Sequence, residues 1–128
     1  MASPEKTPPP VDEIFTNSQW QAQAEQPGIL EQIGRKWDEI VSTKGSSLKA
    51  YLADLQLAYK MIRDPHFQID KRTKTVVIIA LLYIISPIDL IPDAIPLVGM
   101  LDDVLVAGYA LRQAAAELER YRQTVRTP

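Results

Sequence analysis

The chain has 128 residues, 46% of them hydrophobic, which suffices for one domain with its own core. Its 14 basic and 16 acidic side chains give a net charge of -2, which excludes the overall positive charge typical of nucleic-acid-binding proteins. It contains no cysteine, which excludes disulfides, thiolate metal sites and cysteine nucleophiles.

The amino-terminal part of the chain predicts a tail followed by short helices. Residues 1–12 are rich in proline, which favours extended backbone, so we expect a flexible tail. The tail has no apolar stretch behind a basic one and does not resemble a secretory signal, so we expect an intracellular protein, cytoplasmic or associated with a membrane. Amphipathic helices are predicted within 13–45, one over 13–26 with Asp12 as its cap and one over 29–43.

A helical domain is predicted over 46–123, and its first helix is amphipathic. Ser46 or Ser47 is the candidate cap of this helix. The helix is expected to stop at Asp64 and Pro65, because a proline disfavours the helical backbone of the residue before it.

Two more helices are predicted, over 71–85 and 104–122. The first is apolar on every side from Val76 onwards, so other parts of the protein must cover it. Three arginines suit the negative carboxyl end of the second helix dipole: Arg120, Arg122 and Arg126. No alternating strand pattern occurs, so the sequence predicts an all-α protein, a small helical bundle around an apolar hairpin over 76–111.

The segment between these two helices, SPIDLIPDAIPLVGMLDD over 86–103, contains four aspartates and three prolines. Helix capping explains them without any function. Ser86, Pro87 and Asp89 fit a cap, a first-turn proline and a carboxylate three residues after the cap. Asp93 follows a proline in a similar context, and Asp102 can cap the last helix, with the next aspartate in its positive first turn.

A bound divalent cation is a second explanation, because four carboxylates among apolar neighbours are costly when buried without a partner. The candidate ligands are Asp89, Asp93, Asp102 and Asp103. Cations from other helices would relieve the same charge, and the candidates are Lys60, Arg63 and Arg112. Proton uptake is a further possibility, and the spacing matches no known calcium loop or histidine-based metal motif.

A membrane-embedded hairpin over 76–111 is the third explanation. A spanning helix needs about 20 apolar residues, and an aspartate at the bilayer centre costs about 2.5 to 3.5 kcal/mol on insertion scales. A soluble bundle in which amphipathic helices cover the hairpin accounts for the same residues without that cost. The flanking cations Lys71, Arg72, Lys74 and Arg112 would nevertheless suit two cytoplasmic ends.

No catalytic residue is predicted. His66, the only histidine, follows a proline in a loop, and Ser86 has no base near it in the sequence. We therefore expect a non-enzymatic helical module that associates with a membrane or a protein partner; docking of a partner helix would need an exposed groove with Trp37, Tyr51 or Tyr59. The alternative is a divalent-cation-dependent enzyme that uses the four aspartates.

Two stretches, RDP at 63–65 and LLYIISPIDLIPDAIPLVGMLDDVLVAGYAL at 81–111, resemble the signature of the YkvA-like family of mainly bacterial small proteins and domains of unknown function. The resemblance covers about 48–111. It implies a short helical domain whose hydrophobic hairpin is often regarded as membrane-associated, and it implies no established reaction or cofactor. The matching positions are Ser86, Pro87, Asp89, Pro92, Asp93, Pro96, Gly99, Asp102 and Asp103.

Overall fold

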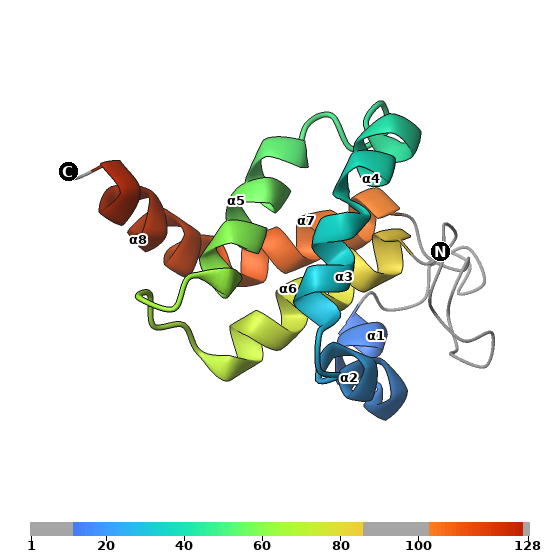
Figure 1. The fold of residues 1–128 in the computed structure, drawn as a ribbon, viewed down its shortest axis with the longest axis horizontal. Coiled ribbons are helices and arrows are strands. Elements are labelled where there is room, and N and C mark those ends of the chain that lie inside the picture. Colours follow the sequence, from blue (N-terminus) through green and yellow to red (C-terminus); the bar gives the residue numbers. More distant parts are fainter. Residues whose placement is uncertain (1–11, 86–102, 127–128) are drawn as a thin grey trace, which may run out of the picture.

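The computed structural model describes residues 12–85 and 103–126, and every regular element in these two ranges is a helix (Figure 1). The predicted all-α class is therefore confirmed. The proline-rich tail predicted before residue 12 lies outside the described residues. The helices are α1 (Asp12–Thr16), α2 (Ser18–Ala24), α3 (Ile29–Arg35), α4 (Trp37–Lys44), α5 (Leu52–Arg63), α6 (Lys71–Ile85), α7 (Asp103–Gln113) and α8 (Ala115–Arg126).

The single helix predicted over 13–26 is wrong, because the chain forms two helices separated by Asn17. The Asn17 side chain accepts hydrogen bonds from the N–H groups of Gln19 at 2.8 Å and Trp20 at 3.1 Å, which makes it the cap of α2. Helix α1 begins at Asp12, one residue earlier than the predicted start.

The helix predicted over 29–43 is also divided, into α3 and α4. At Lys36 the φ of -93° and ψ of 1° depart from helical values, and its N–H is shared between the carbonyls of Gln32 and Ile33. Ile33 before this bend and Ile40 after it are both fully buried, so both short helices pack on the core.

Helix α5 starts later than the predicted caps at Ser46 and Ser47. The chain first forms turns, in which Leu48 is fully buried and donates its N–H to the carbonyl of Lys44 at 2.9 Å. The predicted end of α5 is confirmed, because Asp64 has an extended backbone with φ -77° and ψ 113°, as a residue before proline favours.

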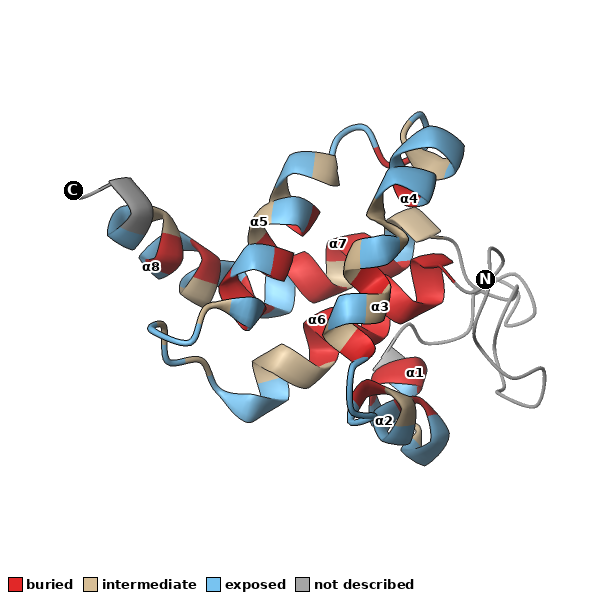
Figure 2. Cartoon of the chain, in the orientation of Figure 1, coloured by how far each residue is buried: buried red, intermediate tan, exposed pale blue. Residues whose placement is uncertain are grey.

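Helix α6 has the predicted bounds and is the centre of the fold (Figure 1). Every side chain from Val76 to Ile85 is buried, so the prediction that this apolar helix must be covered is confirmed (Figure 2). The cover is provided by α1, α2, α3, α5 and α7, all of which contact α6. Helices from the amino-terminal half of the chain thus bury the helix that begins the predicted hairpin.

The single helix predicted over 104–122 is wrong as well, because α7 and α8 are separated at Ala114. Helix α7 packs on α6, whereas α8 contacts α5 and extends away from the central helix (Figure 1). Within 115–124, the part of α8 whose burial the structure describes, Leu118 and Tyr121 are buried.

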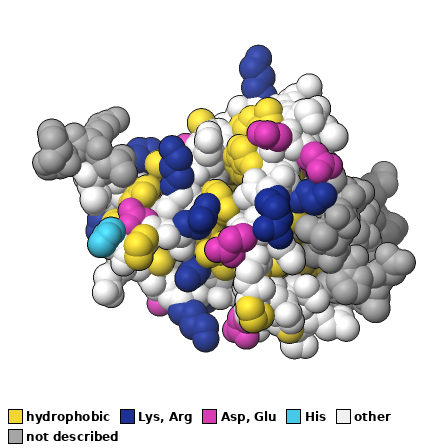
Figure 3. Space-filling view, viewed as in Figure 1, with side chains coloured by type: hydrophobic (Ala, Val, Ile, Leu, Met, Phe, Trp, Pro, Cys, Tyr) yellow, Lys and Arg dark blue, Asp and Glu magenta, His cyan; other side chains and the backbone are white. Residues whose placement is uncertain are grey.

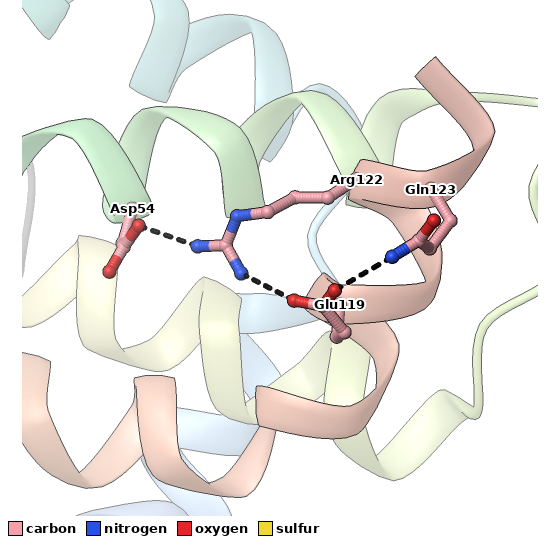
Figure 4. Close-up of polar contacts among 4 residues, drawn as sticks. All are labelled: Asp54, Glu119, Arg122 and Gln123. Carbon is pink, nitrogen blue, oxygen red and sulfur yellow. Dashed lines mark hydrogen bonds and ion pairs between the residues drawn. The ribbon is translucent and has the colours of Figure 1, made fainter. Parts of the chain in front are cut away.

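Arg122 of α8 forms an ion pair with Asp54 of α5 at 2.7 Å and contacts Glu119 at 3.4 Å (Figure 4). Gln123 donates a second hydrogen bond to Glu119 at 3.0 Å. The arginine that the sequence assigned to its own helix dipole therefore joins two helices, and a contact with α5 orients its guanidinium.

Candidate functional site

Most of the predicted motif lies outside the described residues, and its expected capping roles stay predictions. These positions are Ser86, Pro87, Asp89, Pro92, Asp93, Pro96, Gly99 and Asp102. The remaining motif residue, Asp103, is the first residue of α7.

Asp103 forms an ion pair with Lys44, the last residue of α4. Both side chains are only 18% exposed, so the pair is largely removed from water. The predicted partners Lys60, Arg63 and Arg112 are wrong for this aspartate, because the end of α4 and the start of α7 meet although they are 59 positions apart in sequence. No local pattern marks Lys44 as the partner.

The predicted divalent-cation site has one member in the described part of the chain, and that carboxylate is bound to a lysine. Within 12–85 and 103–126, no group of three or more histidine, aspartate or glutamate side chains is placed to hold a metal ion. The other candidate ligands, Asp89, Asp93 and Asp102, lie between these ranges.

A surface groove of about 620 Å³ lies between α3 and α4 on one side and α5 on the other. Figure 3 shows this face of the molecule, on which apolar, basic and acidic side chains are interspersed. We call it the α3–α5 groove, and its lining residues are Glu31, Gly34, Arg35, Trp37, Asp38, Gln56, Tyr59, Lys60 and Arg63. Two of the three aromatic residues predicted for a docking groove therefore lie together here, whereas Tyr51 lies against Gly108 of α7.

Tyr59 forms the floor of the α3–α5 groove. Its ring stacks on the half-buried ring of Trp37, with centroids 6.1 Å apart and an interplanar angle of 13°. The Tyr59 hydroxyl donates to the carbonyl of Leu30, and Arg63 lies over the ring with its guanidinium carbon 5.4 Å from the centroid. This close approach depends on Gly34, because a Cβ there would lie 2.5 Å from the Tyr59 oxygen.

The walls of the groove carry more positive than negative charge. Arg35, Lys60 and Arg63 are exposed, and none forms an ion pair with a carboxylate within the described ranges. The groove's two carboxylates, Glu31 and Asp38, lie on the α3–α4 wall. The charged side chains of the α5 wall are therefore all cations.

A glycine inside a predicted helix often marks close packing, so Gly34 was a usable sequence signal for this site.

A second hollow, of about 690 Å³, lies between the α2–α3 turn, the α5–α6 loop and the start of α6. Asp64 at its edge accepts hydrogen bonds from the N–H of His66 at 2.8 Å and the hydroxyl of Tyr121 at 3.0 Å. These bonds hold the pKa of the Asp64 carboxyl below its ordinary value, while burial and then the bond to Asp64 raise the pKa of Tyr121. His66 is exposed in the turn, as predicted.

The membrane hypothesis is tested in part by helix length and hydropathy. Among the residues that the structure describes, no helix is both long enough and apolar enough to cross a membrane. The most apolar of them, α6, has 15 residues.

Residues 73–109 match the model of a family described as "Protein of unknown function (DUF1232)". This segment resembles an uncharacterised family. The match covers fewer than half of the residues of the chain, and it spans most of α6 and the first part of α7. The α3–α5 groove lies outside it. No curated protein and no solved structure matches the chain.

Proposed function

We propose that this chain is a non-enzymatic helical module of the YkvA-like type that binds a protein partner through the α3–α5 groove. The observation that supports it most is the position of Trp37, half-buried at a hollow whose α5 wall carries Lys60 and Arg63 without carboxylate partners among the described residues. Tryptophan and arginine are enriched at protein interfaces and at the positions that contribute most to binding.

The groove has binding capacity that the described part of the chain does not use. The indole N–H of Trp37 and the side-chain amide of Gln56 have no hydrogen-bond partner among the described residues. Tyr59, in contrast, is fully engaged by Trp37, Arg63 and the Leu30 carbonyl, which makes it a rigid base. A rigid base with free donors above it favours binding, because few side chains need to be ordered when a partner docks.

A partner-binding role fits the burial of α6 better than a membrane-embedded one. The apolar side chains of α6 pack against five helices of the same chain. Embedding α6 in a bilayer would require these contacts to be broken, whereas docking at the α3–α5 groove leaves them intact. The alternative, a divalent-cation-dependent enzyme using Asp89, Asp93, Asp102 and Asp103, rests on the sequence pattern, and Asp103 would first have to leave Lys44.

Site-specific crosslinking tests this proposal directly, because the chain has no cysteine and one introduced thiol is unique. Gln56→Cys places a thiol-linked photocrosslinker in the groove, and Ala115→Cys on exposed α8 is the matched control. In cells of the source organism we expect one recurrent protein adduct from the Gln56→Cys variant and none from the Ala115→Cys variant. Equal adducts from both variants, or no adduct from the groove, would contradict the proposal.

A further inference from the structure

We infer that the partner segment recognised by the α3–α5 groove is an acidic amphipathic helix whose carboxylate-bearing flank faces α5. This inference rests on the proposed function and adds the chemistry and the orientation of the partner. It is carried by the asymmetry of charge between the two walls of the groove.

The α5 wall is a line of donors. Gln56, Lys60 and Arg63 are spaced by four and three residues, so they project from one face of the helix and border the groove. All three are exposed, and no carboxylate of the described residues forms an ion pair with Lys60 or Arg63. A ligand that satisfies this wall must supply acceptors, and carboxylates form the strongest bonds with lysine and arginine.

The α3–α4 wall has mixed charge. Glu31 and Arg35 of α3 and Asp38 of α4 all line this wall, so an arginine and two carboxylates share it. A partner with carboxylates on both flanks would meet repulsion from Glu31 and Asp38. A partner with carboxylates on one flank avoids this repulsion only when that flank faces α5, so the charges define one orientation.

The shape of the groove suits one face of a helix. Its walls are helices, and a third helix can pack along the channel between them. The volume of about 620 Å³ accommodates a few side chains and not a whole helix, so the partner would insert apolar side chains over Trp37 and lie across the opening. The protein as a whole has a net charge of -2, so attraction of an acidic segment must come from this local excess of cations.

The test uses a synthetic amphipathic peptide with leucines on one face and glutamates on one flank, and a second peptide in which lysines replace the glutamates. The chain has two tryptophans, whose indole N–H groups give separate NMR signals. Trp37 reports on the groove, and the fully buried Trp20 is the internal control. We expect saturable shifts of the Trp37 signal with the glutamate peptide, an unchanged Trp20 signal, and at least about ten-fold weaker binding of the lysine peptide.

Two charge-reversal variants make the test specific. Lys60→Glu should weaken the binding of the glutamate peptide by about ten-fold and reduce its salt dependence, whereas Lys49→Glu, at an exposed lysine outside the groove, should leave binding as in the native chain. Equal binding of both peptides, or equal effects of the two variants, would overturn the inference. If the Gln56→Cys variant yields an adduct but the glutamate peptide does not bind, the inference fails alone; if that variant yields no adduct, the proposed function fails with it.

Discussion

At the scale of single residues, the contact between Gly34 and Tyr59 fixes the base of the α3–α5 groove. A Cβ at position 34 would lie 2.5 Å from the tyrosine oxygen but 3.5 Å from the ring carbon that carries it. The first distance is a clash and the second is ordinary contact. The hydroxyl alone therefore requires glycine at this position.

This contact predicts a strong coupling between two substitutions. Gly34→Ala should lower the free energy of unfolding by about 1 to 2 kcal/mol in the native chain, because overpacking outweighs the better helix propensity of alanine. In a Tyr59→Phe background the same change should be neutral or stabilising, since the clashing oxygen is gone. Urea denaturation of the four variants measures the coupling, and additive effects would show that the hydroxyl is not the constraint.

Asp64 and Tyr121 predict how stability depends on pH. The His66 N–H and the Tyr121 hydroxyl lower the folded-state pKa of Asp64, so its contribution is present above the ordinary pKa of about 3.9 and is lost as the pH falls through the lowered value. The pKa of Tyr121 is raised, so its contribution is present below about pH 10 and is lost as the pH rises further. Asp64→Asn should reduce the fall in the free energy of unfolding at acid pH, and Tyr121→Phe should reduce the fall at alkaline pH. Urea denaturation over a series of pH values measures both, and an unchanged pH dependence in either variant would contradict this assignment.

Residues differ in how far the sequence reveals their roles. The turn position of His66 followed from the proline before it. Trp37 and Tyr59 were named as residues that a docking groove would need, and both line the α3–α5 groove, whereas Tyr51 does not. The pairing of Lys44 with Asp103 did not, because it joins positions 59 apart and depends on how α4 and α7 pack. The ion-pair partner of a charged residue depends on tertiary structure, so a local sequence pattern does not reveal it.

At the scale of elements, α6 was predicted with its observed bounds because unambiguous signals mark it. An aspartate precedes its first turn, ten consecutive residues are apolar or aromatic, and a serine and a proline follow it. The division between α7 and α8 has no such signal, since the sequence RQAAAE favours a continuous helix. Contacts of α8 with α5 override that local preference.

The burial of α6 predicts a contrast between two identical substitutions. Leu82 in α6 is fully buried, whereas Leu105 in α7 is 43% exposed. Leu82→Ala should lower the free energy of unfolding by about 2 to 5 kcal/mol, because it removes buried methyl groups and leaves a cavity, while Leu105→Ala should cost less than about 1 kcal/mol. Chemical denaturation measures both, and similar losses would mean that α6 is not the packed centre of the protein.

At the scale of the whole molecule, sequence predicted the class and the structure supplied the arrangement. Hydrophobic periodicity predicted an all-α bundle. Because α6 is apolar on every side from Val76 onwards, it had to be covered by other parts of the protein. Which helices cover it could not be predicted, because periodicity does not specify pairing. The cover includes α1, α2 and α3, so helices outside the matched 73–109 segment bury the helix that this segment contributes.

In this arrangement other helices of the chain cover α6, and we propose that a partner binds on the surface of the bundle. Hydrogen exchange of the full chain, followed by mass spectrometry with and without vesicles containing phosphatidylglycerol, tests it most directly. We predict that α6 exchanges most slowly and that α1, α2, α3 and α5 exchange at the same rates in both conditions. Faster exchange of these covering helices with vesicles, while α6 stays protected, would show that α6 leaves them for the bilayer and would contradict a protein-covered α6.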